Sequence, residues 1–163
     1  MGFLGYKQSK VEEGLRRSTR AVLIGGLFHP DHVEKYGLNE DASATLYTEM
    51  LSHLIYCIGI VFNNKIAGKK SWATPQFMEA SIKNEIGNYE RETGQHPGAV
   101  TSILFKRLYE IEAMSAQQRA SLEHIKESAR RVYQKDSRAD VSNLSKLFET
   151  KTREFVKMLV DRF

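Results

Sequence analysis

The sequence predicts an all-α fold, a single domain built as an irregular bundle of about five to six helices. Apolar residues recur at steps of three and four along most of the chain, which is the spacing of one helix face. No stretch shows the strict alternation or the tight turn of a strand or hairpin. The chain of 163 residues has only 3 prolines and 11 glycines, so a β architecture with many turns is disfavoured. We expect one domain over residues 1–163, with a mobile N-terminus over residues 1–8.

The first helix is predicted from about Ser9 to Leu23, because tandem glycine at 25–26 is costly inside a helix and favourable just after its end. A connecting segment follows, in which Pro30 and Gly37 could start and close one helical turn. The second helix is predicted from about residue 41 or 43 to Asn63. Apolar side chains cover most of its circumference from Leu54 onward, so it should be the central, most buried helix.

Start and stop signals divide the second half of the chain into four more helices. The third begins at Thr74-Pro75, where a side-chain oxygen can cap free amides and proline loses no hydrogen bond, and it ends at Gly94. The fourth opens at Pro97-Gly98 and carries the most regular apolar stripe of the chain. Residues 115–118 form a capping-box pattern that starts the fifth helix, and the last helix begins at about residue 138.

Composition limits the class of protein. Hydrophobic residues make up 41% and charged residues 27% of the chain, which is ordinary for a globular domain and argues against wholesale disorder. The net charge is +4, a mild excess on a mixed surface. The single cysteine, Cys57, fits a reducing compartment. The most apolar run, residues 54–62, is shorter than the about 20 residues of a membrane span. We therefore expect a cytoplasmic protein without a transmembrane segment.

A group of histidines and carboxylates raises the possibility of a metal site. The candidate ligands are His29, His32, Glu49 and His53. Glu49 and His53 are four residues apart and so share one helix face, and imidazole with carboxylate suits zinc, iron or manganese. The spacing matches neither di-iron bundles nor zinc proteases. An ordinary helix start at 29–32 and an ordinary Glu49–His53 pair explain the same residues, and we favour that interpretation.

A basic patch could contact phosphates. It comprises Arg16, Arg17, Arg20, Lys69 and Lys70. Such a patch would supply salt-dependent contacts to nucleic acid that do not depend on base sequence. Acidic residues at 12 and 13 interrupt it, and no aromatic stacking platform lies among its residues. A solvated helix face is therefore the favoured interpretation.

Several helix faces carry more apolar or charged side chains than a small bundle needs. Arg107 lies within the apolar stripe of the fourth helix, where a guanidinium must find a carboxylate or extend to water. Phe105 and Tyr109 give that helix a second apolar side, and Phe155 and Leu159 belong to a rich stripe on the last helix. An apolar face that the domain does not bury is a protein interface. We predict partner contacts at these five residues, although for Arg107 a structural role at the edge of the bundle is the favoured interpretation.

No catalytic motif is present. Cys57 stands in an apolar helix without an adjacent base, and there is no nucleophile elbow or dinucleotide fingerprint. We therefore expect no enzyme and no cofactor. The favoured function is a helical protein-interaction module of adaptor, immunity or regulatory type, which binds another protein or a second copy of itself. The alternatives are a nucleic-acid-binding protein that uses the basic first helix and a metal-dependent helical enzyme.

Overall fold

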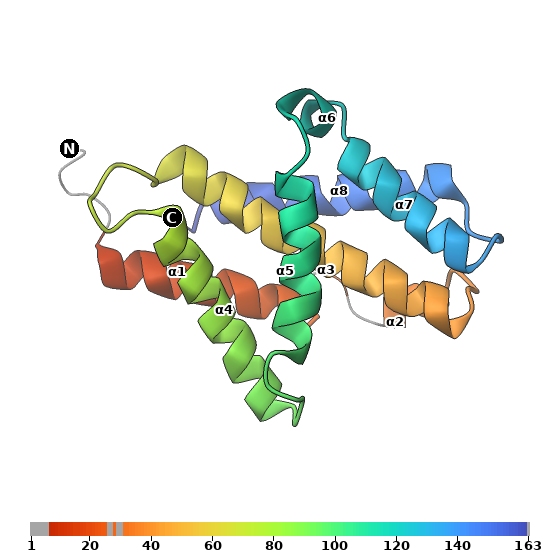
Figure 1. Ribbon diagram of the computed structural model, residues 1–163, viewed down its shortest axis with the longest axis horizontal. Helices are drawn as coiled ribbons and strands as arrows, with labels where there is room; N and C mark the ends of the chain where they lie inside the picture. The colour runs from red at the N-terminus through yellow and green to blue at the C-terminus, as the bar shows by residue number, and fades with distance from the viewer. Residues whose placement is uncertain (1–6, 26–27, 29–30, 163) are drawn as a thin grey trace.

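The computed structural model describes residues 7–25, 28 and 31–162 of the chain. These residues form eight helices and no strand, which confirms the all-α prediction (Figure 1). The helices are α1 (Gln8–Leu23), α2 (Asp31–Glu34), α3 (Glu40–Lys65), α4 (Pro75–Glu92), α5 (Ala99–Glu112), α6 (Ala116–Ala120), α7 (Glu123–Lys135) and α8 (Val141–Val160). Two short helices, α2 and α6, bring the number above the predicted five to six.

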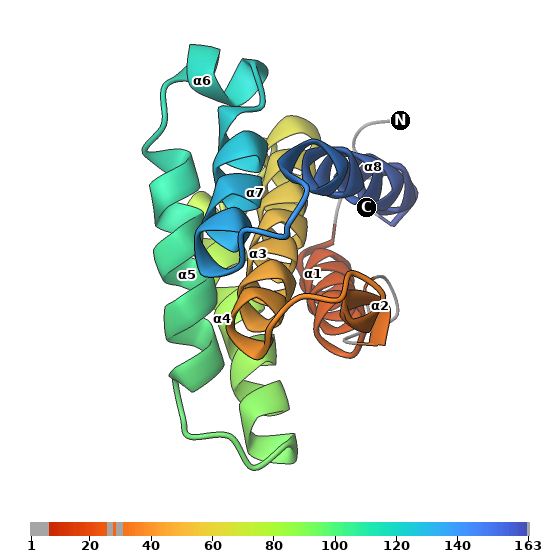
Figure 2. The same ribbon diagram turned by 90° about the vertical axis from the view of Figure 1, so that its right-hand side faces the viewer.

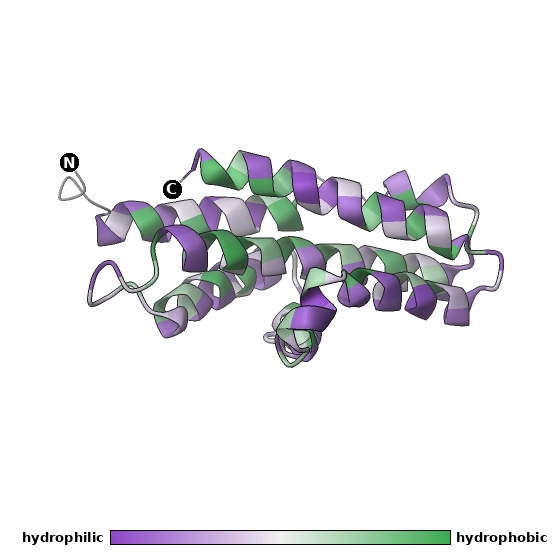
Figure 3. Cartoon of the chain, turned by 90° about the horizontal axis from the view of Figure 1, so that it is seen from above, coloured by the Kyte–Doolittle hydropathy of each residue, from purple (hydrophilic) through white to green (hydrophobic). Residues whose placement is uncertain are grey.

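The helix α3 is the centre of the fold, as predicted. It has 26 residues and packs against α1, α5, α7 and α8. In Figure 2, α3 lies between α5 on one side and α1 and α8 on the other. Hydrophobic and hydrophilic residues alternate in bands along the helices, which is the pattern of amphipathic helices around a shared core (Figure 3). The helix α5 crosses α3 at a steep angle and is the outermost helix on its side (Figures 1 and 2).

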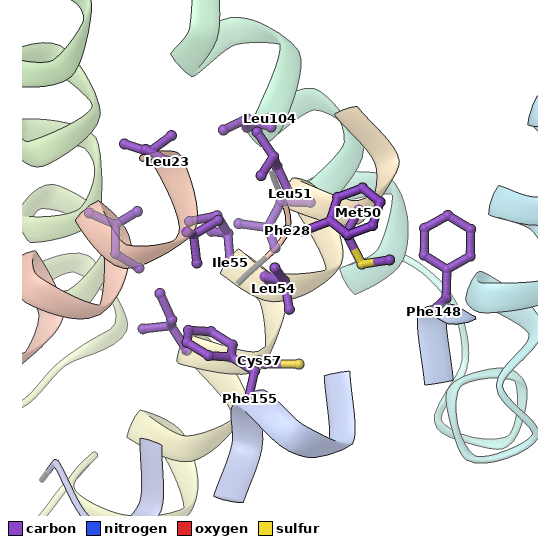
Figure 4. Packing of buried hydrophobic residues seen from close by; sticks show 14 of the residues in the cluster. Leu23, Phe28, Met50, Leu51, Leu54, Ile55, Cys57, Leu104, Phe148 and Phe155 are labelled. Atoms are coloured by element: carbon purple, nitrogen blue, oxygen red, sulfur yellow. The ribbon is translucent and has the colours of Figure 1, made fainter. Parts of the chain in front are cut away.

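The core joins residues from the two ends of the chain. Leu23 of α1, Leu104 of α5 and Phe148 and Phe155 of α8 gather around α3 (Figure 4). Phe148 and Phe155 are fully buried. Among the described residues, α3 is the one helix that is long and apolar enough to cross a membrane. In its most apolar stretch of 18 residues, 67% is buried inside the fold. The core helix of a folded domain passes the same test.

Capping groups set the predicted helix boundaries. Thr74 accepts a hydrogen bond from the Phe77 amide at 3.1 Å and begins α4, and Ser115 and Gln118 form the expected capping box at α6. The predicted fifth helix is divided in two, because α6 ends at Ala120 and Leu122 takes a left-handed conformation with φ 60°. The break changes the direction of the chain, so α7 begins at Glu123 and packs against α3 and α8.

A buried carboxylate joins α4 to α5. The Glu90 side chain is 2% exposed and accepts hydrogen bonds from the amides of Gly98, Val100 and Thr101 at 3.1, 2.7 and 3.2 Å. Free amides at the start of a helix need acceptors, and a carboxylate also matches the positive end of the helix dipole. Glu90 thereby fixes where α5 starts and how it crosses α3.

Candidate functional site

A buried ion pair lies where α5 crosses α3. The Nε atom of Arg107 donates to Glu49 Oε2 at 3.0 Å, and the two side chains are only 4% and 5% exposed. A guanidinium in an apolar helix stripe needs such a partner, because an unpaired buried charge is costly. Arg107 is therefore an internal residue, so the prediction that it contacts a partner protein is corrected.

Ser128 of α7 extends this ion pair into a network across three helices. Its hydroxyl lies 3.2 Å from Glu49 Oε1, 3.2 Å from a terminal nitrogen of Arg107 and 2.6 Å from His53 Nε2. Arg107 also donates to the His124 carbonyl at 3.4 Å. The sequence indicated Glu49 and His53 as candidate metal ligands and Arg107 as a charge within an apolar stripe. Ser128, which the sequence did not single out, brings the three together. We call these residues the polar network.

The outer edge of the polar network is a cluster of half-buried charges. Arg131 Nε lies 3.5 Å from Glu49 Oε1, and another of its nitrogens donates to Glu110 at 2.8 Å and to Glu127 at 3.1 Å. Glu49 is thus flanked by two guanidinium groups. The cluster connects the buried ion pair to the surface between α5 and α7.

The environment of the network decides its protonation. Burial raises the pKa of Glu49, while the charges of Arg107 and Arg131 act in the opposite direction. Burial lowers the pKa of His53 well below its usual value, and the neighbouring His124 and Arg107 lower it further. The His53 imidazole is therefore neutral at pH 7. Burial raises the pKa of the Cys57 thiol to about 12, so Cys57 is not an activated nucleophile.

The predicted metal ligands do not assemble into a metal site in the part of the chain that the structure describes. His29 lies outside the described residues, and His32 packs its ring against Phe28 at a centroid distance of 5.9 Å. Glu49 and His53 are hydrogen-bonded within the polar network. Residues 7–25, 28 and 31–162 contain no group of three or more His, Cys, Asp or Glu side chains that could hold a metal ion.

The predicted basic patch is largely neutralised. Arg16 and Arg20 of α1 both pair with Glu85 of α4, at 3.3 and 2.6 Å, and Arg20 also pairs with Glu92 at 2.8 Å. Arg17 pairs with Glu13 at 2.7 Å. Glu85 and Glu92 were not singled out in the sequence, because they lie far along the chain from their partners. Lys69 and Lys70 lie in the exposed turn between α3 and α4.

Most of the predicted partner-contact residues are buried within the chain. Phe155 and Leu159 are completely buried and Phe105 is 4% exposed, so the prediction of an interface at these residues is wrong. The reason is that α8 packs against both α3 and α7, and α5 packs its second apolar side against α4. Tyr109 is the exception: it is 45% exposed, and its hydroxyl donates to Glu79 and accepts from Lys83 of α4.

The helix α5 forms a ridge with a groove on each flank. The groove toward α4, which we call the α4 groove, has a volume of about 400 Å³ and is lined by residues of α3, α4 and α5 with Arg119 of α6. The groove toward α7 has a volume of about 360 Å³ and ends on Glu49, Arg107 and Arg131 of the polar network. Ile103, 56% exposed, lines this second groove.

No protein-family model, curated protein or solved structure matches this chain. The function is therefore inferred from the residues of this chain alone. The thiol of Cys57 is not ionised. The polar network directs the hydrogen-bonding groups of Glu49, Arg107 and Ser128 toward one another. Its arrangement holds three helices in register, and the surfaces able to receive another molecule lie beside it.

Proposed function

We propose that this chain is a helical protein-interaction module, of the adaptor, immunity or regulatory type, that binds an amphipathic helix of another protein in the α4 groove. The observation that carries the proposal is the combination of an apolar floor and an acidic rim in that groove. An amphipathic helix places its apolar face in such a groove and its charged residues along the edge.

The floor of the α4 groove is apolar and opens at a glycine. It is formed by Ile55, Gly59, Met78, Ile82, Phe105 and Leu108. A Cβ atom added to Gly59 would lie 3.5 Å from Cε of Met78, an ordinary contact. Glycine in the interior of a helix lowers its stability by about 0.5–1 kcal/mol relative to alanine. Because Gly59 has no side chain, the groove is deeper at this position, and we propose that this benefit to binding offsets the loss of helix stability.

The rim of the groove carries two carboxylates. Glu79 pairs with Lys83 at 2.7 Å, whereas Glu112 has no salt bridge among the described residues. Burial raises the pKa of Glu112 and the charge of Glu79 raises it further, while the charge of Arg119, which also lines the groove, acts in the opposite direction. A Lys or Arg of the incoming helix would compensate this negative charge, so the rim favours a partner with a basic residue beside its apolar face.

The shape of the surface favours a macromolecule. The α5 ridge separates two grooves, and exposed Ile103 and Tyr109 stand on it. A partner protein can contact the ridge and insert side chains into the groove on its flank. Nucleic acid fits less well, since the α1 arginines are occupied by Glu85, Glu92 and Glu13.

A displayed library of amphipathic helical peptides, sorted for binding to the purified chain, tests the proposal. We expect enriched peptides with apolar residues at helical spacing and an adjacent Lys or Arg. Gly59→Leu fills the groove and also raises helix propensity, and Glu112→Lys reverses the charge of the rim. Each should weaken binding of the enriched peptides roughly tenfold or more, equivalent to about 1.4 kcal/mol.

The matched control is Glu154→Lys on α8, which makes the same charge change at a residue that does not line the groove. It should leave binding unchanged. Failure to enrich any peptide, or equal binding by Gly59→Leu and the parent chain, would overturn the proposal. Light scattering is run in parallel: a dimer that Gly59→Leu dissociates would assign the groove to a second copy of this chain and so would also overturn it.

A further inference from the structure

Three residues that line one cavity each have a buried polar atom without a hydrogen-bond partner among the described residues. These atoms are Nδ1 of His53, Nδ1 of His124 and Nε of Arg119. The cavity has a volume of about 400 Å³ and lies between α3, α7 and α8, with Arg119 of α6 and Leu122 at its edge. We call it the histidine cavity. Buried polar atoms are nearly always hydrogen-bonded, so three at one place need an explanation.

We infer that the histidine cavity binds an amphipathic organic carboxylate, with its head group between Arg119, His124 and Lys157 and its apolar part along α3 and α8. This inference does not rest on the proposed protein contact in the α4 groove, although Tyr56, Ile60 and Arg119 line both sites. Binding pockets of this kind combine a mainly apolar lining with a few convergent polar groups, and typically have volumes of about 300–1,000 Å³.

The charges around the cavity favour an anion. Its lining contains the cations Arg119, Arg153 and Lys157 and one carboxylate, Glu149. Glu149 already pairs with Arg153 at 3.2 Å. The positive charges of Arg119 and Lys157 therefore remain to receive a carboxylate. Arginine and lysine hydrogen bonds to a carboxylate are charge-assisted and stronger than neutral ones.

The start of α7 adds to this preference. The residue before the helix is Leu122, whose side chain cannot accept a hydrogen bond from the first amides, so the helix has no side-chain cap. His124 and Ile125, in the first turn, line the cavity. The N-terminus of a helix attracts anions through its free amides and its dipole. In the histidine cavity this preference coincides with Arg119 and the His124 imidazole.

Backbone strain is found at the same place. Leu122 has φ 60° and ψ 31°, and it is the one non-glycine residue with positive φ among the described residues. Such a conformation is unfavourable for a residue with a β-carbon, because the β-carbon comes too close to the following carbonyl oxygen. It separates α6 from α7 and places both Arg119 and Leu122 at the cavity. Retained strain of this kind is typical of ligand sites.

The apolar part of the ligand would contact Ile60 of α3, Ile125 of α7 and Val156 of α8. These side chains have no charge to offer, so they favour a hydrocarbon chain or ring. Tyr56 also lines the cavity and packs its ring against His124 at a centroid distance of 5.7 Å. The two ends of the cavity thus favour opposite ends of an amphipathic molecule.

The test compares octanoate, octanol and octylammonium, which share one chain and differ in charge, by calorimetry with the full chain. We expect octanoate to bind most tightly. Nitrogen–proton NMR of the imidazoles locates the binding, because octanoate should shift the signals of His53 and His124. A carboxylate beside His124 favours the imidazolium, so octanoate should also raise the pKa of His124.

Two variants and a control complete the test. Lys157→Glu reverses one charge at the mouth and should weaken octanoate binding roughly tenfold. Lys146→Glu makes the same change on α8 at an exposed residue that does not line the cavity, and should have no effect. Val156→Trp fills the apolar part of the histidine cavity, and circular dichroism checks that this variant folds. If Val156→Trp does not fold, Lys157→Glu still tests the site.

Equal binding of octanol and octanoate would overturn the carboxylate assignment. Histidine signals that do not move on addition of octanoate, or equal effects of Lys157→Glu and Lys146→Glu, would overturn the location. Gly59 and Glu112 do not line the histidine cavity, whereas Tyr56, Ile60 and Arg119 line both sites. The charge of Glu112 also acts on Arg119, so Gly59→Leu is the variant that tests the α4 groove separately. Loss of peptide binding in that variant with octanoate binding retained would show the two sites to be distinct.

Discussion

Replacing Arg107 by methionine removes one member of a buried ion pair and keeps a similar side-chain volume. Breaking such a pair costs about 3–5 kcal/mol, because the remaining charge is left buried and uncompensated. Arg131, 3.5 Å from the other oxygen of Glu49, offsets part of this loss. We therefore expect Arg107→Met to lower the free energy of unfolding by about 3 kcal/mol. A domain with an ordinary stability of about 5–15 kcal/mol remains folded after such a loss.

The assay is urea unfolding followed by circular dichroism, on Arg107→Met, Glu49→Met and the double variant. The double variant has no orphaned charge in the pair, so it should be more stable than the sum of the single losses predicts, with a coupling energy of about 2 kcal/mol. A loss below about 1 kcal/mol for Arg107→Met, or additive losses in the double variant, would refute the reasoning.

The same variant has a pH dependence with a defined sign. Burial raises the pKa of Glu49 in the folded chain, and removing Arg107 takes away one of the charges that opposes this rise. A carboxyl group whose pKa is higher in the folded than in the unfolded chain destabilises the fold as pH rises through that interval. The cost of Arg107→Met should therefore become smaller as pH is lowered from 7 toward the unfolded pKa of about 4.3.

Four further predictions follow from individual residues. Phe155→Ala should cost about 3–5 kcal/mol because the ring is fully buried, while Tyr133→Ala on the exposed side of α7 should change stability by less than about 0.5 kcal/mol in the same urea assay. Burial raises the pKa of Cys57 from 9.0 to about 12, so an aromatic disulfide reagent at about pH 8 should label the native chain roughly a thousandfold more slowly than the unfolded chain; equal rates would contradict this. Leu122→Gly should be more stable than Leu122→Ala by about 1 kcal/mol in thermal unfolding, the reverse of the order inside a helix, because glycine adopts positive φ without strain. Hydrogen bonds from a guanidinium and two backbone amides hold the pKa of Asp136 well below its usual range, so Asp136→Asn should destabilise the chain at pH 7. The difference should shrink as pH falls below about 4, since a lowered carboxyl pKa stabilises the fold above the unfolded value and the effect is lost in acid; a difference independent of pH would contradict it.

The helices were predictable because their signals are local. Thr74-Pro75, the Ser115–Gln118 capping box and the apolar load of residues 54–62 each act within a few residues of the chain, and each has the expected place in the structure. The division at Leu122 was missed, since leucine carries no preference for a left-handed backbone. Only the packing of α7 against α3 and α8 accounts for the change of direction there.

The pairings of charges were not predictable in the same way. The sequence indicated that Arg107 needed a carboxylate, but Glu49, its partner, lies 58 residues earlier and was considered as a metal ligand. Arg20 pairs with Glu85, 65 residues away. In both cases either residue alone fits several interpretations, and the choice depends on which helix faces meet.

The sequence by itself determined the all-α class, the central role of α3 and most helix boundaries, because helix periodicity, capping and glycine breaks act over a few residues. The tertiary structure alone decided which faces are internal. It buried Phe155 and Leu159, neutralised the arginines of α1, joined Glu49, His53 and Arg107 through Ser128, and left open the α4 groove and the histidine cavity. The physical reason is that burial and charge pairing depend on distances between helices far apart in the chain, and only the packing of the helices against one another sets those distances.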